Sequence, residues 1–183
     1  MIARGWKWLL AALGVALIVH GASVLLLPRF IMSRTMAGIA KQAGTNTILY
    51  APRATARARG VVRPSPDLLY SICVYDLDAA GGAVRVSTQD MPKTYWSVSV
   101  FDADTNNFYA LNDQQATRGA KTRAADFILM AQATSAGPGR LPVVAAPTNR
   151  GIVLFRTLVN DEAQLAAIDA ARHNAACEPY KAG

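Results

Sequence analysis

The sequence predicts a mainly β protein: an N-terminal transmembrane helix, then a small antiparallel β-sandwich or jelly-roll-like domain with one C-terminal helix. Three observations lead to this fold class. A long apolar run lies near the N-terminus, short segments rich in β-branched and aromatic residues follow between turn signals, and one of them alternates strictly in polarity. We divide the 183 residues into an anchor (1–28), a juxtamembrane helix with a basic linker (29–63) and a β-rich domain (64–183).

The anchor is the apolar run from Trp8 to Leu27. As a helix, a run of this length spans about 30 Å, which matches the hydrocarbon core of a bilayer. A cleaved signal peptide is the alternative, since the small residues 21–23 resemble a cleavage site. The apolar run continues past those residues, so an uncleaved, single-pass anchor fits the pattern better.

The positive charge is concentrated beside the anchor. The chain carries a net charge of +7, and residues 29–63 contain seven basic residues and no acidic one. From Pro64 onward, ten basic residues face twelve acidic ones, a net charge of −2. Such a distribution favours contact with lipid headgroups and argues against nucleic-acid binding, so the lipid bilayer is the predicted partner.

A short amphipathic helix is predicted over residues 29–43, where Met32, Met36 and Ile39 share one face. This helix either continues the anchor or lies along the membrane interface, and Gly44 ends it. The basic, low-complexity stretch 52–60 is predicted to be a linker or exposed arm.

The β-rich domain is predicted from six segments separated by Gly, Pro, Asn and Asp turn signals, such as the one at 137–139. In one segment Trp96, Val98 and Val100 alternate with polar residues, which is typical of an antiparallel strand with one buried face. The expected strands are Leu69–Tyr75, Ala83–Thr88, Thr94–Phe101, Asn107–Leu111, Asp126–Ala131 and Gly151–Leu158.

The C-terminal helix is predicted from a capping box at 161–164 followed by an amphipathic stretch through Leu165, Ile168 and Arg172. His173 and Cys177 would lie one turn apart if this helix continued, which is a weak two-ligand metal signal. Cys73 and Cys177 lack metal-type spacing, so they either form one disulfide in an oxidising compartment or remain unrelated thiols.

Oxygen-bearing side chains follow one expected strand at spacings that partly match a calcium loop. Asn107 stands where that loop needs glycine, and a tight turn whose side chains hydrogen-bond their own backbone is the alternative. The candidate metal ligands are Asp102, Asp104, Asn106 and Asp113.

Acidic and aromatic residues form a second candidate site, because stacking rings beside carboxylates can bind a sugar or another polar molecule. Paired carboxylates could also act as acid and base in glycoside hydrolysis. The alternative is that the aromatic residues pack the core while the aspartates cap turns. The candidate ligand-binding residues are Asp67, Tyr70, Tyr75, Asp76, Tyr95 and Trp96, with Asp78 and Tyr109 nearby in sequence.

Four segments in order resemble the bacterial domain-of-unknown-function family 1254. They are the Asp-x-x-Tyr-Ser segment at 67–71, Asp-Leu at 76–77, the aromatic strand at 95–98 and Thr-Asn-Asn-Phe at 105–108. Many members carry a second β domain that this chain lacks, so it resembles a short, membrane-anchored, single-domain branch. The resemblance implies a β-sandwich in a bacterial envelope and supplies no catalytic residue.

Together these observations predict a membrane-tethered envelope module that binds a small molecule or an envelope protein without catalysis and needs no cofactor. An enzyme acting on a small polar or carbohydrate-like substrate through the Asp/Tyr cluster is the alternative. The positive-inside count is closely balanced and slightly favours a cytoplasmic domain. The envelope association of the family favours the periplasmic side of the inner membrane instead.

Overall fold

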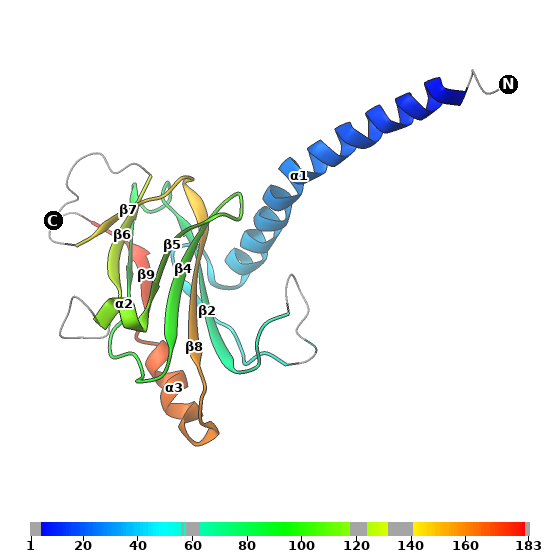
Figure 1. Cartoon of the computed structure of the whole chain (residues 1–183). Helices are drawn as coiled ribbons and strands as arrows, with labels where there is room; N and C mark the ends of the chain where they lie inside the picture. The colour runs from blue at the N-terminus through cyan, green and yellow to red at the C-terminus, as the bar shows by residue number, and fades with distance from the viewer. Residues whose placement is uncertain (1–4, 56, 58–62, 118–123, 132–140, 182–183) are drawn as a thin grey trace.

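The computed structural model describes residues 5–55, 57, 63–117, 124–131 and 141–181. Helix α1 (Gly5–Ala43) projects from a β-sandwich, as Figure 1 shows. The predicted turn at 137–139 and part of the basic linker, including Arg59, lie outside the described residues. The predicted fold class is confirmed: a long apolar helix precedes two mostly antiparallel sheets and a small C-terminal helix.

Within the described residues, the first sheet (sheet A) has five strands in the order β1-β2-β8-β4-β5. Its neighbouring strands are all antiparallel. They are β1 (Ile48–Tyr50), β2 (Leu68–Asp76), β8 (Arg150–Leu158), β4 (Trp96–Asp102) and β5 (Asn107–Asn112).

The second sheet (sheet B) has four strands in the order β7-β6-β3-β9 within the same described residues. Strands β6 and β7 are parallel, which departs from the all-antiparallel prediction. The strands are β7 (Val143–Ala145), β6 (Asp126–Met130), β3 (Ala83–Ser87) and β9 (Ala176–Pro179). The remaining elements are α2 (Asp113–Thr117), the 3-10 turn η2 (Glu162–Gln164) and α3 (Leu165–Arg172).

All six predicted strands are present with small shifts at their ends. Strands β1, β7 and β9 are three or four residues long, too short for an alternating pattern to reveal them. Since β1 pairs with β2, the folded domain includes residues that the sequence analysis assigned to the linker. The predicted boundary at residue 64 therefore falls inside the sandwich.

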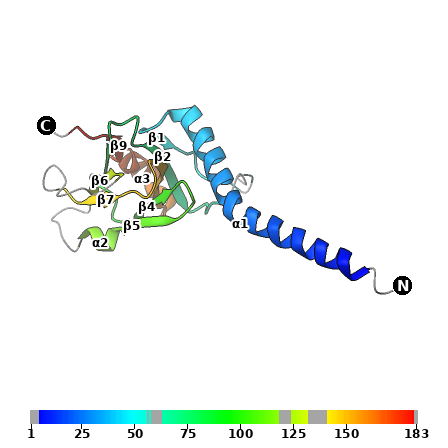
Figure 2. The same ribbon diagram turned by 90° about the horizontal axis from the view of Figure 1, so that it is seen from above.

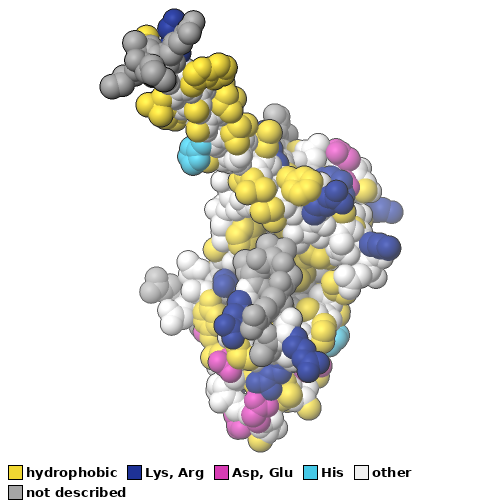
Figure 3. All heavy atoms as spheres, turned by 90° about the vertical axis from the view of Figure 1, so that its right-hand side faces the viewer, with side chains coloured by type: hydrophobic (Ala, Val, Ile, Leu, Met, Phe, Trp, Pro, Cys, Tyr) yellow, Lys and Arg dark blue, Asp and Glu magenta, His cyan; other side chains and the backbone are white. Residues whose placement is uncertain are grey.

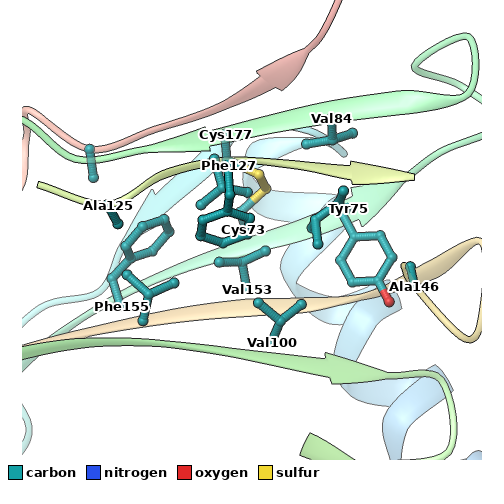
Figure 4. Packing of buried hydrophobic residues seen from close by; sticks show 14 of the residues in the cluster. Cys73, Tyr75, Val84, Val100, Ala125, Phe127, Ala146, Val153, Phe155 and Cys177 are labelled. Carbon is teal, nitrogen blue, oxygen red and sulfur yellow. A yellow bond between two sulfur atoms is a disulfide. The ribbon is translucent and has the colours of Figure 1, made fainter. Parts of the chain in front are cut away.

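The core lies between the two sheets. Figure 4 shows Val100, Val153 and Phe155 of sheet A facing Val84 and Phe127 of sheet B. Residues Trp96, Val98 and Val100 are fully buried here, as their alternation predicts. Cys73 of β2 and Cys177 of β9 are joined by a disulfide that crosses this core, so the pairing that the sequence left open is present.

Helix α1 covers the other face of sheet A. Met32, Met36 and Ile39 are buried against a cluster that includes Val74 of β2 and Ile152 of β8. Figure 2, seen from above, places α1 on one side of sheet A and strands β6, β7 and β9 on the other. The predicted amphipathic helix therefore continues the anchor as one helix, and its apolar face packs on protein.

Two polar features mark the two ends of the packed segment of α1. Gly44 adopts φ +85° and its N–H donates to the Ala40 carbonyl at 2.8 Å, a left-handed cap that ends the helix as predicted. Arg29 donates to both carboxylate oxygens of Asp104, in the β4–β5 turn, through one edge of its guanidinium, at 2.6 Å from Nε and 3.1 Å from Nη2. The glycine cap ends the helix, and the Arg29–Asp104 contact attaches the start of its packed segment to the turn between β4 and β5.

Gly151, at the start of β8, allows a close approach in the core. A Cβ at this position would overlap the Phe101 carbonyl and lie 2.5 Å from the Tyr75 hydroxyl. We expect Gly151→Ala to lower the free energy of unfolding by about 3 kcal/mol, because the overlapping carbonyl is backbone and cannot rotate away.

Chemical denaturation of the full chain in detergent measures this loss. Gly38→Ala is the matched control, since a Cβ at residue 38 meets no atom within 4 Å and helix α1 favours alanine. Equal stability of Gly151→Ala and the parent protein would contradict the close approach.

Candidate functional site

The predicted acidic and aromatic residues do not line one pocket. Asp67 precedes β2 and Asp76 ends it, so the two carboxylates lie about 30 Å apart along an extended strand. Tyr75 and Trp96 are fully buried in the core, whereas Tyr95 is exposed. The glycoside-hydrolysis alternative needs two carboxylates about 5–10 Å apart, so the pair Asp67 and Asp76 does not support it.

Two of the aspartates in this set have structural partners. Asp76 forms an ion pair with Arg150 at 3.1 Å and accepts the Ala79 N–H at 3.0 Å. Asp78 accepts a hydrogen bond from the Asn149 side chain at 2.8 Å. These contacts join the β2–β3 turn to the start of β8.

The predicted metal loop is a tight turn. Asp102 is buried, and its Oδ1 accepts the N–H groups of Asp104 and Asn106, both at 2.8 Å. Its Oδ2 accepts from the Asn106 side chain at 2.9 Å, while Asp104 turns outward to Arg29. The Asp102 carboxylate is therefore used within the turn, as in the alternative that the sequence left open.

Asp113 lies far from this turn. It begins α2 at the opposite end of β5, about 20 Å away along the strand. The four predicted ligands therefore do not meet at one point, and within the described ranges no three His, Cys, Asp or Glu side chains are grouped to hold a metal ion.

The His173 and Cys177 pair is also separated. Helix α3 ends at Arg172, and His173 stacks on the Tyr50 ring with 3.9 Å between ring centroids. Cys177 lies beyond, on β9, and is bonded to Cys73. The continued helix that this metal hypothesis requires is absent, so the hypothesis was wrong.

A polar row crosses the outer face of sheet A beside the part that α1 covers. The strand register aligns Tyr70 of β2, Arg156 of β8, Ser97 of β4 and Asn112 of β5. Arg156 donates from Nε to Ser97 Oγ at 3.1 Å and from Nη2 to Ser99 Oγ at 3.2 Å. Tyr70 is thus the one member of the predicted ligand set that lies beside a half-buried cation in the described sheet.

This row was not predicted from the sequence, because its members come from different strands. Ser97 and Ser99 occupy alternate positions on β4, where an ordinary strand would expose them to solvent. Both are buried, at 4% and 2% exposure, and Arg156 lies in the apolar stretch of β8. Pairing of β4 with β8 was needed to bring the three together.

The comparisons with known proteins place this fold in a family. The family described as "Protein of unknown function (DUF1254)" matches residues 45–179. The chain belongs to DUF1254. No curated protein matches the chain significantly.

Two solved structures share the DUF1254 chain's fold. A Vibrio parahaemolyticus protein superimposes with a TM-score of 0.64 and 16% identity, over 86% of this chain and 37% of its own. An uncharacterized Burkholderia cenocepacia protein gives a TM-score of 0.51 and 17% identity, over 83% of this chain and 41% of its own. The chain therefore spans less than half of either protein.

Because the Tyr75 phenol is buried, the fold becomes less stable at alkaline pH. Burial raises the pKa of Tyr75 to about 12, above its ordinary value of 10.0. Between these values the unfolded state loses its proton first, so the free energy of unfolding falls as pH rises. We expect this phenol to account for a loss of about 1.4 kcal/mol by pH 11.

Denaturation midpoints at pH 8 to 11 would measure this effect. Tyr75→Phe should flatten the pH dependence, and Tyr95→Phe, at an exposed ring, is the matched control that should leave it unchanged. A Tyr75→Phe profile parallel to that of the parent protein would show that Tyr75 is not responsible.

Proposed function

We propose that this protein is a single-pass, inner-membrane binding module of the bacterial envelope. In this proposal the sandwich lies on the periplasmic side and binds a partner protein or a small ligand without catalysing a reaction. The observation that carries the proposal is the continuity of α1, which joins an apolar segment directly to a face of sheet A.

The projecting part of α1 has the surface of a membrane-spanning helix. Large apolar side chains from Trp6 to Leu27 are more than half exposed, an arrangement that water disfavours and lipid favours. Figure 3 shows these apolar side chains covering the projecting part of the helix. Among the described residues, α1 is the one helix long and apolar enough to cross a membrane.

The disulfide supports the periplasmic side. Cys73 and Cys177 are separated by 104 residues in the sequence and joined in the core. Disulfides persist in oxidising compartments such as the periplasm and are rare where thiols are kept reduced. This argument agrees with the envelope association of the family and opposes the slight lean of the positive-inside count.

Packing of α1 on sheet A holds the sandwich in a fixed position relative to its membrane helix. Burial of a side chain such as Met36 contributes roughly 1.5–3 kcal/mol, and Arg29 adds a bidentate contact to Asp104. The sandwich is held against the membrane end of its anchor, which suits a module that meets another membrane-bound component.

The redox state of Cys73 and Cys177 in living cells tests the side of the membrane. We expect both thiols to be oxidised, so that a bulky maleimide labels them only after denaturation and reduction. Cys73→Ala provides the matched control, because Cys177 then becomes labelled after denaturation alone. A reduced pair, with a C-terminal reporter active only in the cytoplasm, would refute the periplasmic placement.

Trypsin cleavage after Lys41 tests the docking of α1 in detergent micelles or lipid nanodiscs. Met36→Asp would place a carboxylate against Val74 and Ile152, so we expect the helix end to detach and cleavage to accelerate about tenfold or more. Ser33→Asp adds the same charge on the exposed side of the helix and should leave the rate unchanged. Equal rates for both variants would contradict the docking.

A further inference from the structure

Arg156 differs in its partners from the other described arginines of the two sheets, Arg85 and Arg150. Among the described residues, five arginines contact a carboxylate: Arg29, Arg53, Arg85, Arg150 and Arg172. Arg156 contacts two serine hydroxyls and no carboxylate, although it is half-buried on the outer face of sheet A. Its positive charge is therefore partly removed from water without a neutralising partner in that part of the chain.

The two serines hold the guanidinium in one orientation. Ser97 accepts from Nε and Ser99 from Nη2, so one edge of the planar group is occupied. The two Nη1 protons and the second Nη2 proton remain, and the end edge of the guanidinium presents one proton from each of these two nitrogens. This edge matches the spacing of two carboxylate oxygens, so it can donate two parallel hydrogen bonds.

One further hydroxyl, that of Tyr70, belongs to the residue paired with Arg156 in the strand register. Tyr70, beside Arg156 in register, accepts the Ser65 N–H at 2.9 Å through its hydroxyl oxygen, which leaves the phenolic proton available. Asn112 lies beyond Ser97 on β5, and its side-chain oxygen accepts the N–H groups of Gln114 and Gln115 at the start of α2. One cation among neutral donors balances one negative charge, which favours a carboxylate over a phosphate dianion.

We propose that Arg156, oriented by Ser97 and Ser99, binds the carboxylate of an acidic ligand on the outer face of sheet A. The inference rests on the binding role proposed above and names the chemistry that the module recognises. The carboxylate is supplied by a free small molecule or by an acidic side chain of a partner.

Lipid headgroups are a poor source for this anion. Strand β8 starts near the turn that contacts Arg29 and runs away from the end where α1 leaves the sandwich (Figure 1). Arg156 lies six residues beyond Arg150, which is about 20 Å further along the strand. The site therefore faces the compartment beyond the membrane surface.

NMR of arginine side chains tests the site in the full chain in non-ionic micelles. The Arg156 Nε–H resonance is assigned from its loss in Arg156→Lys. It is then followed during titration with two carboxylates, propionate and a blocked glutamate. Chloride and inorganic phosphate at matched ionic strength are the control anions. We expect saturable shifts with both carboxylates at about millimolar concentration. Tighter binding of propionate would indicate a small-molecule source, and tighter binding of blocked glutamate a protein source.

Variants separate the site from general electrostatics. Arg156→Gln should weaken carboxylate binding about tenfold or more, read from the Ser97 and Ser99 amide shifts, and Arg156→Lys should give an intermediate affinity. Arg150→Gln, on the same strand and already paired with Asp76, should leave the affinity unchanged.

Three results would overturn the site. The first is that carboxylates shift the Arg156 resonance only at concentrations where chloride also does. The others are tighter binding of phosphate than of either carboxylate, and equal carboxylate affinities for Arg156→Gln and the parent chain. The circular dichroism spectrum of each variant is compared with that of the parent, and Arg156→Lys keeps the test decisive if Arg156→Gln fails to fold. The titration is done in micelles and does not depend on which side of the membrane the sandwich occupies. A failed titration therefore rejects the carboxylate site without rejecting the periplasmic placement.

Discussion

Burial of both faces of sheet A is the constraint on which the rest of the structure depends. Strands β2 and β8 each contain four consecutive apolar residues, Ile72 to Tyr75 and Ile152 to Phe155, so neither of these stretches has a polar side to leave in water. Sheet B covers one face and helix α1 the other. A sandwich without the C-terminal half of α1 would expose the second apolar face, so the membrane helix is part of the fold.

Much of the fold could be predicted from the sequence because its signals are local. The apolar run, the alternation in β4 and the capping side chain of Asp161, which accepts the Ala163 N–H at 2.9 Å, each act within a few residues. Strands β1 and β9 are short and exist only because distant partners pair with them. The alternation in β4 predicted one buried face, and the burial of the second face of sheet A under α1 depends on contacts between residues far apart in the sequence.

Prediction of the candidate site failed for a related reason. Asp102 and Asp76 were singled out because carboxylates near aromatic residues suggest ligand chemistry, yet they use their oxygens to shape turns and pair with Arg150. Arg156, Ser97 and Ser99 come from segments more than fifty residues apart and meet only through the β4–β8 register. Sequence spacing carries no information about such a meeting.

The unbroken course of α1 has a mechanical consequence. A single helix passes from the apolar segment to the residues that touch sheet A, with Pro28 as the only proline inside its described length. A span that is longer than the local hydrocarbon thickness tilts to fit it. Since the sandwich is fixed to the same helix, a change in bilayer thickness would lean the whole domain, and Arg156 with it, toward or away from the membrane plane.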